Sequence, residues 1–300
     1  MSEPPAPALR FKDAQGRAFP DWQMKRLEEV AHKTASSIRA RSLETSSGDY
    51  PVYGANGIAG FVDYFSSDEP HIGVVKDGAG VGRLYYCPSQ SSVLGTLESV
   101  TASGGNSTKF IYYWMSQINF AAYSTGSTIP HVYFKDYGKK KGRFPDSAEQ
   151  SKIAAFLSAV DRRIALLERR RALLTRYKRG LMQKLFSRDL RFKDAQGRNF
   201  PDWQVKRLGE VGRYRSGNFV SASEISDTPQ EGLFPCFGAN GLRGYTSSKT
   251  QSGTFALIGR QGALCGNVQL VSGDFHATEH AIVVFPNIQA NTIWLYYELD

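Results

Sequence analysis

The chain of 300 residues is long enough for about two domains, each with a buried core. No apolar run reaches the roughly 18–20 residues of a membrane span. The first nine residues also lack the basic and apolar parts of a secretory signal. Three cysteines without C-x-x-C spacing argue against a disulfide scaffold or a zinc knuckle, and they fit the reducing cytoplasm. The 37 basic and 28 acidic residues give a net charge of +9, which indicates a polyanionic partner only where the charge is concentrated.

The chain contains an internal repeat. Residues 9–27 and 190–208, here called the first and second repeat segments, match at 17 of 19 positions with an offset of 181 (190 − 9). Further along, a looser match at an offset of 184 pairs residues 54–57 with 238–241. We therefore predict two copies of one domain. Nothing follows residue 300 to match residues 117–187, so we expect the second copy to be incomplete, either in a fragment or in a naturally shorter form.

Each copy shows the pattern of a mixed α/β domain. Short strands are predicted at 51–53, 60–62, 71–75 and 84–86, with counterparts at 254–258 and 268–271 and a helix at 110–115. Glycines are shared between the copies, whereas the surrounding side chains have diverged. This is the pattern expected when one scaffold presents two different reading surfaces, although drift after duplication is an alternative.

Polar residues concentrate in the loops and at the basic stretches. Side chains of Arg, Lys, Asn and Gln can reach base edges in DNA, and Ser suits phosphate contacts. On that chemistry the predicted DNA-contacting residues are Lys76, Arg83, Ser107, Lys109, Lys139, Lys140, Arg215, Arg243, Arg260, Gln261 and Asn267.

A long helix is predicted between the two copies, at residues 149–186, with a capping box formed by Ser147 and Gln150. Its length would be roughly 57 Å, at about 1.5 Å per residue. Ten basic and two acidic residues lie within 161–188, which indicates either a solvated face or a track for phosphates. Apolar residues recur every 3.5 residues on average, which is typical of helix-on-helix packing. The residues predicted to form this packing interface are Ile153, Leu157, Val160, Ile164, Leu167, Leu174 and Leu181.

An amphipathic core helix within one globular domain is the alternative, but about 38 residues exceeds the usual length of such helices. Because the sequence contains one helix of this kind, its partner must come from elsewhere, either from the lost end of the second copy or from a second molecule. We therefore expect self-association or instability of this form.

Two motifs suggest enzyme chemistry and fit it poorly. The glycine-rich stretch at 78–82 lacks the spacing of a phosphate-binding P-loop. His276, Glu279 and His280 have the order of a zinc-protease motif, but they follow Gly273 and run into a predicted strand at 281–286 rather than lying on a helix. A metallohydrolase is thus a weaker hypothesis than a binding protein, and we predict no catalytic and no metal-binding residues.

Several segments resemble the specificity subunit of type I restriction–modification enzymes. In that family a proline-led Glu-Gln-x-Lys-Ile segment opens a spacer helix, as residues 145–157 do, and a run like residues 177–186 (YKRGLMQKLF) closes it. Residues 19–27 and 200–208 resemble the start of each target recognition domain, and residues 125–130 (TGSTIP) resemble a motif near the end of that domain.

The resemblance implies an α+β chain with target recognition domains at 1–145 and 188–300, joined by a coiled-coil-type spacer helix at 146–187. Compared with the family pattern, the second domain is expected to lack its C-terminal part and a second spacer helix. Each domain would read one half of a split double-stranded DNA target, and the helix would set the spacing and dock two methyltransferase subunits. Endonuclease subunits would complete the complex. S-adenosylmethionine, ATP and Mg²⁺ would bind those partners, so this subunit would be non-catalytic and free of cofactors. A coiled-coil scaffold without nucleic acid and a DNA-binding protein outside restriction–modification remain alternatives.

Overall fold

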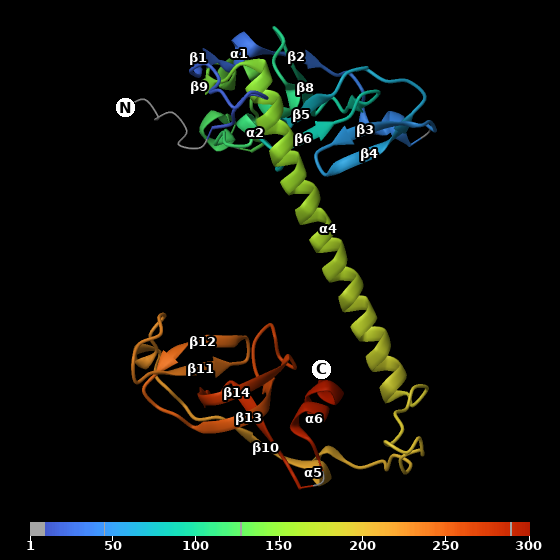
Figure 1. Ribbon diagram of the computed structural model, residues 1–300, viewed down its shortest axis with the longest axis vertical. Coiled ribbons are helices and arrows are strands. Elements are labelled where there is room, and N and C mark those ends of the chain that lie inside the picture. The colour runs from blue at the N-terminus through green and yellow to red at the C-terminus, as the bar shows by residue number, and fades with distance from the viewer. Residues whose placement is uncertain (1–9, 45, 127, 289) are drawn as a thin grey trace. The chain divides into compact units, whose positions relative to one another are not determined.

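A computed structural model describes residues 10–300 except 45, 127 and 289 (Figure 1). The stretch considered as a secretory signal, Leu9 of the first repeat segment and Ser127 of the 125–130 motif lie outside the described residues. The chain divides after Arg170 into two compact units. In the described part of the chain, no helix combines the length and the apolar character needed to cross a membrane.

Unit 1 contains two main sheets. The four-stranded sheet is antiparallel, with the order β2 (Ala31–Ala35), β8 (Leu97–Ala102), β5 (His71–Val75), β6 (Leu84–Cys87). The three-stranded sheet has the order β4 (Gly57–Val62), β3 (Tyr50–Gly54), β7 (Ser92–Val93). A separate antiparallel pair joins β1 (Gln23–Arg26) to β9 (Lys141–Phe144). The short helices are α1 (Leu27–Val30), α2 (Thr108–Met115) and α3 (Phe134–Tyr137).

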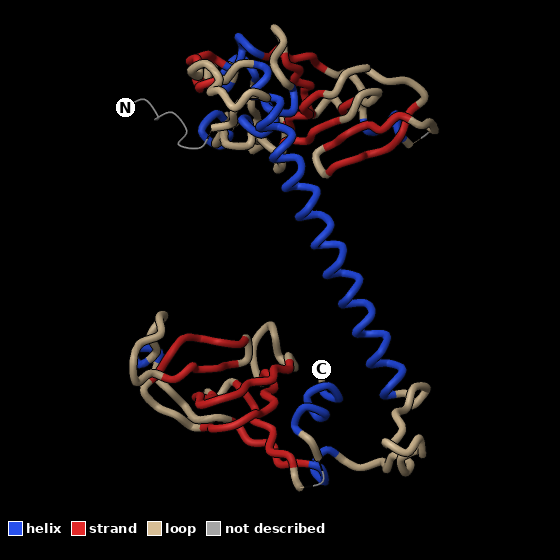
Figure 2. The backbone as a smooth tube through the Cα atoms, in the orientation of Figure 1, coloured by secondary structure: helices blue, strands red, loops and turns tan. Residues whose placement is uncertain are grey.

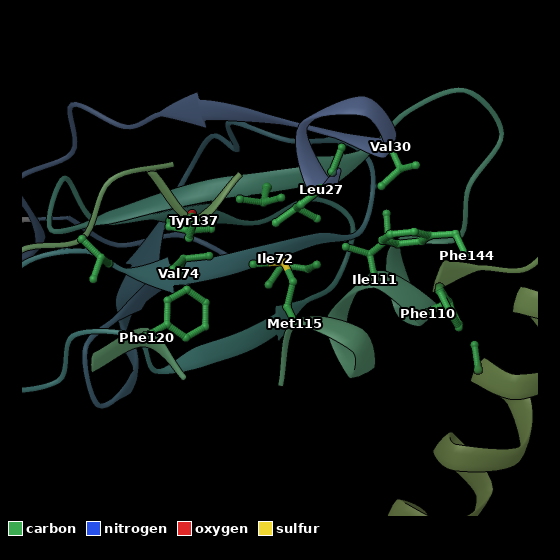
Figure 3. Close-up of a cluster of buried hydrophobic side chains, with 14 residues drawn as sticks. Leu27, Val30, Ile72, Val74, Phe110, Ile111, Met115, Phe120, Tyr137 and Phe144 are labelled. Atoms are coloured by element: carbon green, nitrogen blue, oxygen red, sulfur yellow. The ribbon is translucent and has the colours of Figure 1, made fainter. Parts of the chain in front are cut away.

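The core of unit 1 lies where α2 and the segment after it cover the four-stranded sheet. Strand β5 is buried along its whole length, as expected of a central strand covered on both faces. Figure 3 shows Ile111 and Met115 of α2 in the same cluster as Ile72 of β5. Phe144 of β9 is 1% exposed and belongs to this cluster. Strand β9 is therefore held by packing against the core as well as by pairing with β1.

Unit 2 contains one six-stranded sheet. Its order is β10 (Gly212–Ser216), β15 (Ala281–Pro286), β13 (Gln251–Gly259), β14 (Val268–Ala277), β11 (Phe234–Gly238), β12 (Gly241–Thr246). The short helices of this unit are α5 (Leu208–Val211) and α6 (Thr292–Leu299).

The two units repeat one topology. The long strand β14 pairs with β13 along one part and, in parallel, with β11 at its end, so it corresponds to β6 and β7 joined. The hairpin register shifts at Val52/Tyr53 in unit 1 and at Cys236/Phe237 in unit 2, which are equivalent positions at the offset of 184. Aromatic contacts repeat too, because Trp22–Phe110 and Trp203–Trp294 each have ring centroids 6.4 Å apart.

The helix α4 (Ser147–Phe186) is a single helix of 40 residues (Figure 2), which confirms the α+β fold with a long connecting helix. The predicted cap is wrong. The Asp146 carboxylate accepts the hydrogen bond from Glu149 N at 2.8 Å and so takes the role assigned to Ser147. The Gln150 side chain is used elsewhere, since it accepts from Ser107 N at 2.9 Å and donates to Pro145 O at 2.9 Å.

Candidate nucleic-acid interface

Each unit carries a loop of glycine and polar residues packed against a hairpin turn. The glycine loops, residues 76–83 and 260–267, connect β5 to β6 and β13 to β14. In unit 1, Arg83 Nη1 donates to Ala55 O at 2.6 Å and to Asn56 Oδ1 at 3.0 Å, and Tyr85 Oη donates to Ala55 O at 2.8 Å. The loop and the β3–β4 turn therefore form one surface.

In unit 2 the same turn is bound by a different side chain. Gln269 stands at the position of Tyr85, and its Nε2 donates to Ala239 O at 3.4 Å. Arg243 lies along this hairpin, because a Cβ added to Gly238 would come within 3.1 Å of Arg243 Cδ. The glycine loop and the hairpin turn beside it, here called the loop-and-hairpin frame, are arranged alike in the two units. The side chains that bind the turn differ.

The loop backbones are equivalent. Gly82 N donates to Val75 O at 2.8 Å, and Gly266 N donates to Gly259 O at 2.8 Å. Gly82 and Gly266 have φ of +81° and +87°, a region that L side chains rarely adopt. A Cβ on Gly82 would also lie 2.4 Å from Phe120 Cβ, whereas Gly266 has open space around it.

In unit 1 the loop begins with a polar cluster. Asp77 accepts from Lys76 Nζ at 3.1 Å and lies 2.8 Å from His131 Nδ1. Burial opposes ionisation of Asp77, but the hydrogen bonds from His131 and Lys76 outweigh it and hold the pKa of this carboxyl below its usual value. Gly78 N donates to Pro130 O at 3.0 Å, which places the 125–130 motif beside the glycine loop.

In unit 2 the equivalent cluster has other chemistry. Arg260 stands at the position of Lys76, and its Nη1 donates to Ser216 Oγ at 2.9 Å. Gln261 stands at the position of Asp77, and its Oε1 lies 2.9 Å from His280 Nδ1. The side chain next to Ser216 is Arg215, which is exposed. The predicted residues brought to this end of the sheet in unit 2 are Arg215, Arg243, Arg260, Gln261 and Asn267.

Unit 1 brings only Lys76 and Arg83 of its predicted residues to the glycine loop. The register shows why, because Val75 pairs with Leu97 beside the loop, whereas Ala102, where β8 ends and leads to α2, lies at the opposite end of the sheet. Of the predicted residues, the ones at this opposite end are Ser107, Lys109, Lys139 and Lys140.

Ser107, Lys109 and Lys140 have structural contacts there. Ser107 is the N-cap of α2, and its hydroxyl accepts from Phe110 N at 3.2 Å. Lys109 Nζ lies 3.7 Å from the ring centroid of Tyr86, a cation–π contact. Burial lowers the pKa of Lys109, and Asp161 partly offsets this effect. Lys140 O accepts from Leu27 N at 3.0 Å.

Two side chains of the loop surface of unit 1 were not among the predicted residues. His131 is 54 residues from Asp77 in the chain, so its hydrogen bond could not be foreseen from local spacing. Asn56 lies between strands β3 and β4, and its side chain accepts from Arg83 Nη1 at 3.0 Å. The Thr-Gly-Ser-Thr-Ile-Pro motif was the available signal, because it ends one residue before His131.

The histidines of the zinc-like motif have other partners. His276 Nδ1 lies 2.6 Å from Ser248 Oγ, and His276 Nε2 lies 3.1 Å from Asn218 O. His276 lies within strand β14, one residue before its end at Ala277, and His280 lies beyond that strand, so the two imidazoles do not share a helix face. Within residues 10–300, apart from the three positions not described, no group of His, Cys, Asp and Glu is arranged to hold a metal ion.

Comparison with known proteins places the chain in a family. Residues 20–176 match the type I restriction modification DNA specificity domain. Over 95 residues the chain is 48% identical to the EcoprrI specificity subunit of Escherichia coli. The matched stretch covers 31% of this chain and 24% of that protein. Over 238 residues it is 27% identical to the MjaVIII specificity subunit of Methanocaldococcus jannaschii, covering 72% of this chain and 55% of that protein.

The fold agrees with a solved structure. The crystal structure of the S subunit of a type I restriction–modification system from M. genitalium superposes with a TM-score of 0.74 at 20% identity, over 98% of this chain and 79% of that one. The family match covers more than half of the 300 residues and includes the glycine loop of unit 1 and most of α4. The chain therefore belongs to the family of type I restriction–modification DNA specificity domains.

Proposed function

We propose that this chain is the DNA-specificity component of a type I restriction–modification complex and that each unit reads one half of a split duplex target. The observation that carries this proposal is the shared loop-and-hairpin frame with different polar side chains. Lys76 and Asp77 of unit 1 are replaced by Arg260 and Gln261 in unit 2. Arg suits guanine, Gln suits adenine and a carboxylate suits the cytosine amino group, so the two surfaces would select different bases.

In this proposal α4 sets the distance between the two half-sites. Forty residues at about 1.5 Å each give a helix of roughly 60 Å. That length exceeds one turn of duplex DNA, about 34–36 Å, so two separate major-groove contacts are compatible with it. The exposed basic residues of α4 would contact phosphates or acidic partner surfaces, and their affinity for DNA would fall as salt rises.

The exposed apolar stripe of α4 supports helix packing with a second helix. Val160, Ile164, Leu167 and Leu174 are 40–56% exposed and follow the 3.5-residue repeat. A stripe of this kind favours burial against another helix, supplied by self-association or by a partner subunit. Methyltransferase subunits with S-adenosylmethionine, and endonuclease subunits with ATP and Mg²⁺, are the proposed partners. The chemistry would be theirs, and this chain would be non-catalytic.

The test is to map methylated sites with variants of single loops. The chain is reconstituted with its modification partners, and the methylated sequences are determined for wild type, Arg260→Ala with Gln261→Ala, and Lys76→Ala. We expect the first variant to relax one half of a split target and the second to relax the other. Lys139→Ala, at the far end of the unit 1 sheet, is the matched basic control and should change neither half. A contiguous target, or loop variants that leave both halves intact, would contradict the proposal.

A further inference from the structure

The hairpin turn beside each glycine loop has the same sequence in both units. Residues 55–57 and 239–241 are both Ala-Asn-Gly, and they lie where β3 leads into β4 and where β11 leads into β12 (Figure 1). The glycine that ends the turn has φ of +104° in unit 1 and +102° in unit 2. An exposed arginine lies beside each turn, Arg83 in unit 1 and Arg243 in unit 2. A positive charge at the turn is therefore common to both units.

Different strands supply these two arginines. Arg83 comes from the end of the glycine loop, one residue before β6, whereas Arg243 lies within β12. At the offset of 184 the counterpart of Arg83 is Asn267, and the counterpart of Arg243 is Ala59. The arginine has thus changed its position between the units, while the charge beside the turn has been kept. This exchange indicates that the charge itself is needed there.

Stabilisation of the turn is not the shared reason for that charge. In unit 1 the turn carbonyl accepts from Tyr85 Oη as well as from Arg83 Nη1. In unit 2 the equivalent carbonyl accepts from Gln269 Nε2 at 3.4 Å. Within the part of the chain that the structure describes, Arg243 donates no hydrogen bond and neither arginine pairs with a carboxylate. Both guanidinium groups are therefore available to an anion from outside the chain.

The backbone directs both side chains to the same place. A Cβ added to Gly238 would lie 3.5 Å from Arg243 Cγ and 3.1 Å from Arg243 Cδ, so the aliphatic part of this side chain crosses the glycine that precedes the turn. In unit 1, Ala59 Cβ lies 3.1 Å from the equivalent position on Gly54. An arginine at position 59 would therefore start along the path that Arg243 follows in unit 2.

We propose that Arg83 and Arg243 each bind a phosphate group of the DNA backbone and that neither selects a base. This inference rests on the proposed function and gives these two residues a task separate from base reading. The phosphodiester backbone is common to two different half-sites, and contacts with it fix the position of the protein without carrying sequence information. A guanidinium suits this anion because it can donate two parallel hydrogen bonds. Arg83 uses Nη1 for the turn, and its Nε and Nη2 are the pair that would bind the phosphate.

The test gives one unit the arrangement of the other. In the complex reconstituted with its modification partners, fluorescence anisotropy measures duplex binding over a series of salt concentrations, and the methylated sequences are mapped. Arg83→Asn should weaken the binding of specific and unrelated duplexes alike by about tenfold, the scale of one hydrogen bond to a charged group. It should also reduce the slope of log affinity against log salt concentration by about 1. Adding Ala59→Arg should restore both values, and the methylated sequence should stay the same throughout.

The reciprocal exchange and a control complete the set. In unit 2, Arg243→Ala should weaken binding and adding Asn267→Arg should restore it. Arg17→Gln is the control, because Arg17 is an exposed arginine whose charge is already paired with Asp13, with Nε 2.7 Å from Oδ2. It should leave affinity and salt slope unchanged. Restored binding also shows that the unit carrying the two substitutions is folded.

Three results would overturn the proposal. The first is a relaxed base in the target of Arg83→Asn, since this would make Arg83 a base contact. The second is an unchanged salt slope. The third is failure of Ala59→Arg to restore binding in a double variant that melts at the wild-type temperature. These results are independent of the loop variants at Lys76, Arg260 and Gln261, whose methylated sequences test the proposed function.

Discussion

The two glycine loops allow a matched pair of substitutions, Gly82→Ala and Gly266→Ala. Both positions have a left-handed backbone, with φ of +81° and +87°. Alanine in this region costs about 1–2 kcal/mol at either site. At Gly82 the new Cβ would also lie 2.4 Å from Cβ and 2.8 Å from Cγ of Phe120, whereas at Gly266 it would meet nothing within 4 Å.

The steric conflict adds to the cost at Gly82. Phe120 is 7% exposed and belongs to the main core of unit 1, so it cannot move without disturbing its neighbours. Overpacking of this kind typically costs about 1–3 kcal/mol. We therefore expect Gly82→Ala to destabilise unit 1 by about 2–5 kcal/mol, and Gly266→Ala to destabilise unit 2 by about 1–2 kcal/mol.

Urea denaturation read by hydrogen exchange measures each unit separately, with peptides from residues 71–87 and 255–271 as reporters. Because the loop is part of the proposed interface, Gly82→Ala should also impair recognition of the first half-site and spare the second. Equal destabilisation by the two substitutions would refute this prediction, since it would mean that the contact with Phe120 adds no cost to the free energy of folding.

Three further predictions concern the helix, the thiols and a buried acid. Gly180→Ala should stabilise α4 by about 1 kcal/mol, because alanine favours the helix and its Cβ would meet no atom within 4 Å. Circular-dichroism melting measures this change. A loss of stability would show that a second helix packs at Gly180. Iodoacetamide at pH 8 should label exposed Cys265 and spare buried Cys87 and Cys236, and mass spectrometry would follow the labelling. Burial raises the pKa of Cys87 to about 12, so this thiol stays protonated and unreactive. Labelling of Cys87 in the native protein would contradict this burial. Burial raises the pKa of Glu98 above its usual 4.5, so its contribution to unit 1 stability is full below that value and is lost as pH rises through the folded pKa. Glu98→Gln should remove this part of the pH dependence of the urea midpoint, and an unchanged profile would argue against it.

Local pattern predicted the long helix and the repeat well. The 3.5-residue spacing of apolar residues predicted a helix at 149–186, and the structure has it at Ser147–Phe186. The cap was misassigned because Asp146 and Ser147 are both good capping residues. The choice between them depended on Gln150, whose side chain is drawn to Ser107 by packing that no local pattern reports.

Site residues were harder to predict, because loop composition does not say which end of a sheet a loop occupies. Lys76 and Lys109 look alike in the sequence. Strand pairing places Lys76 in the glycine loop and Lys109 at the other end, against the ring of Tyr86. His131 reaches Asp77 across 54 residues for the same reason. These placements depend on the antiparallel pairing of β5 with β8, which is a non-local contact.

Periodicity and self-similarity along the chain were sufficient to predict two related domains, a helix of about 40 residues and the positions of the glycine turns. These features depend on the backbone preferences of neighbouring residues. Tertiary structure decided which polar side chains share a surface and which repeat segment is covered. The near-identical segments show this most clearly. Arg10 and Arg191 have the same sequence around them, yet a buried carboxylate reaches Arg10 because strand pairing and helix docking bring distant parts of unit 1 together.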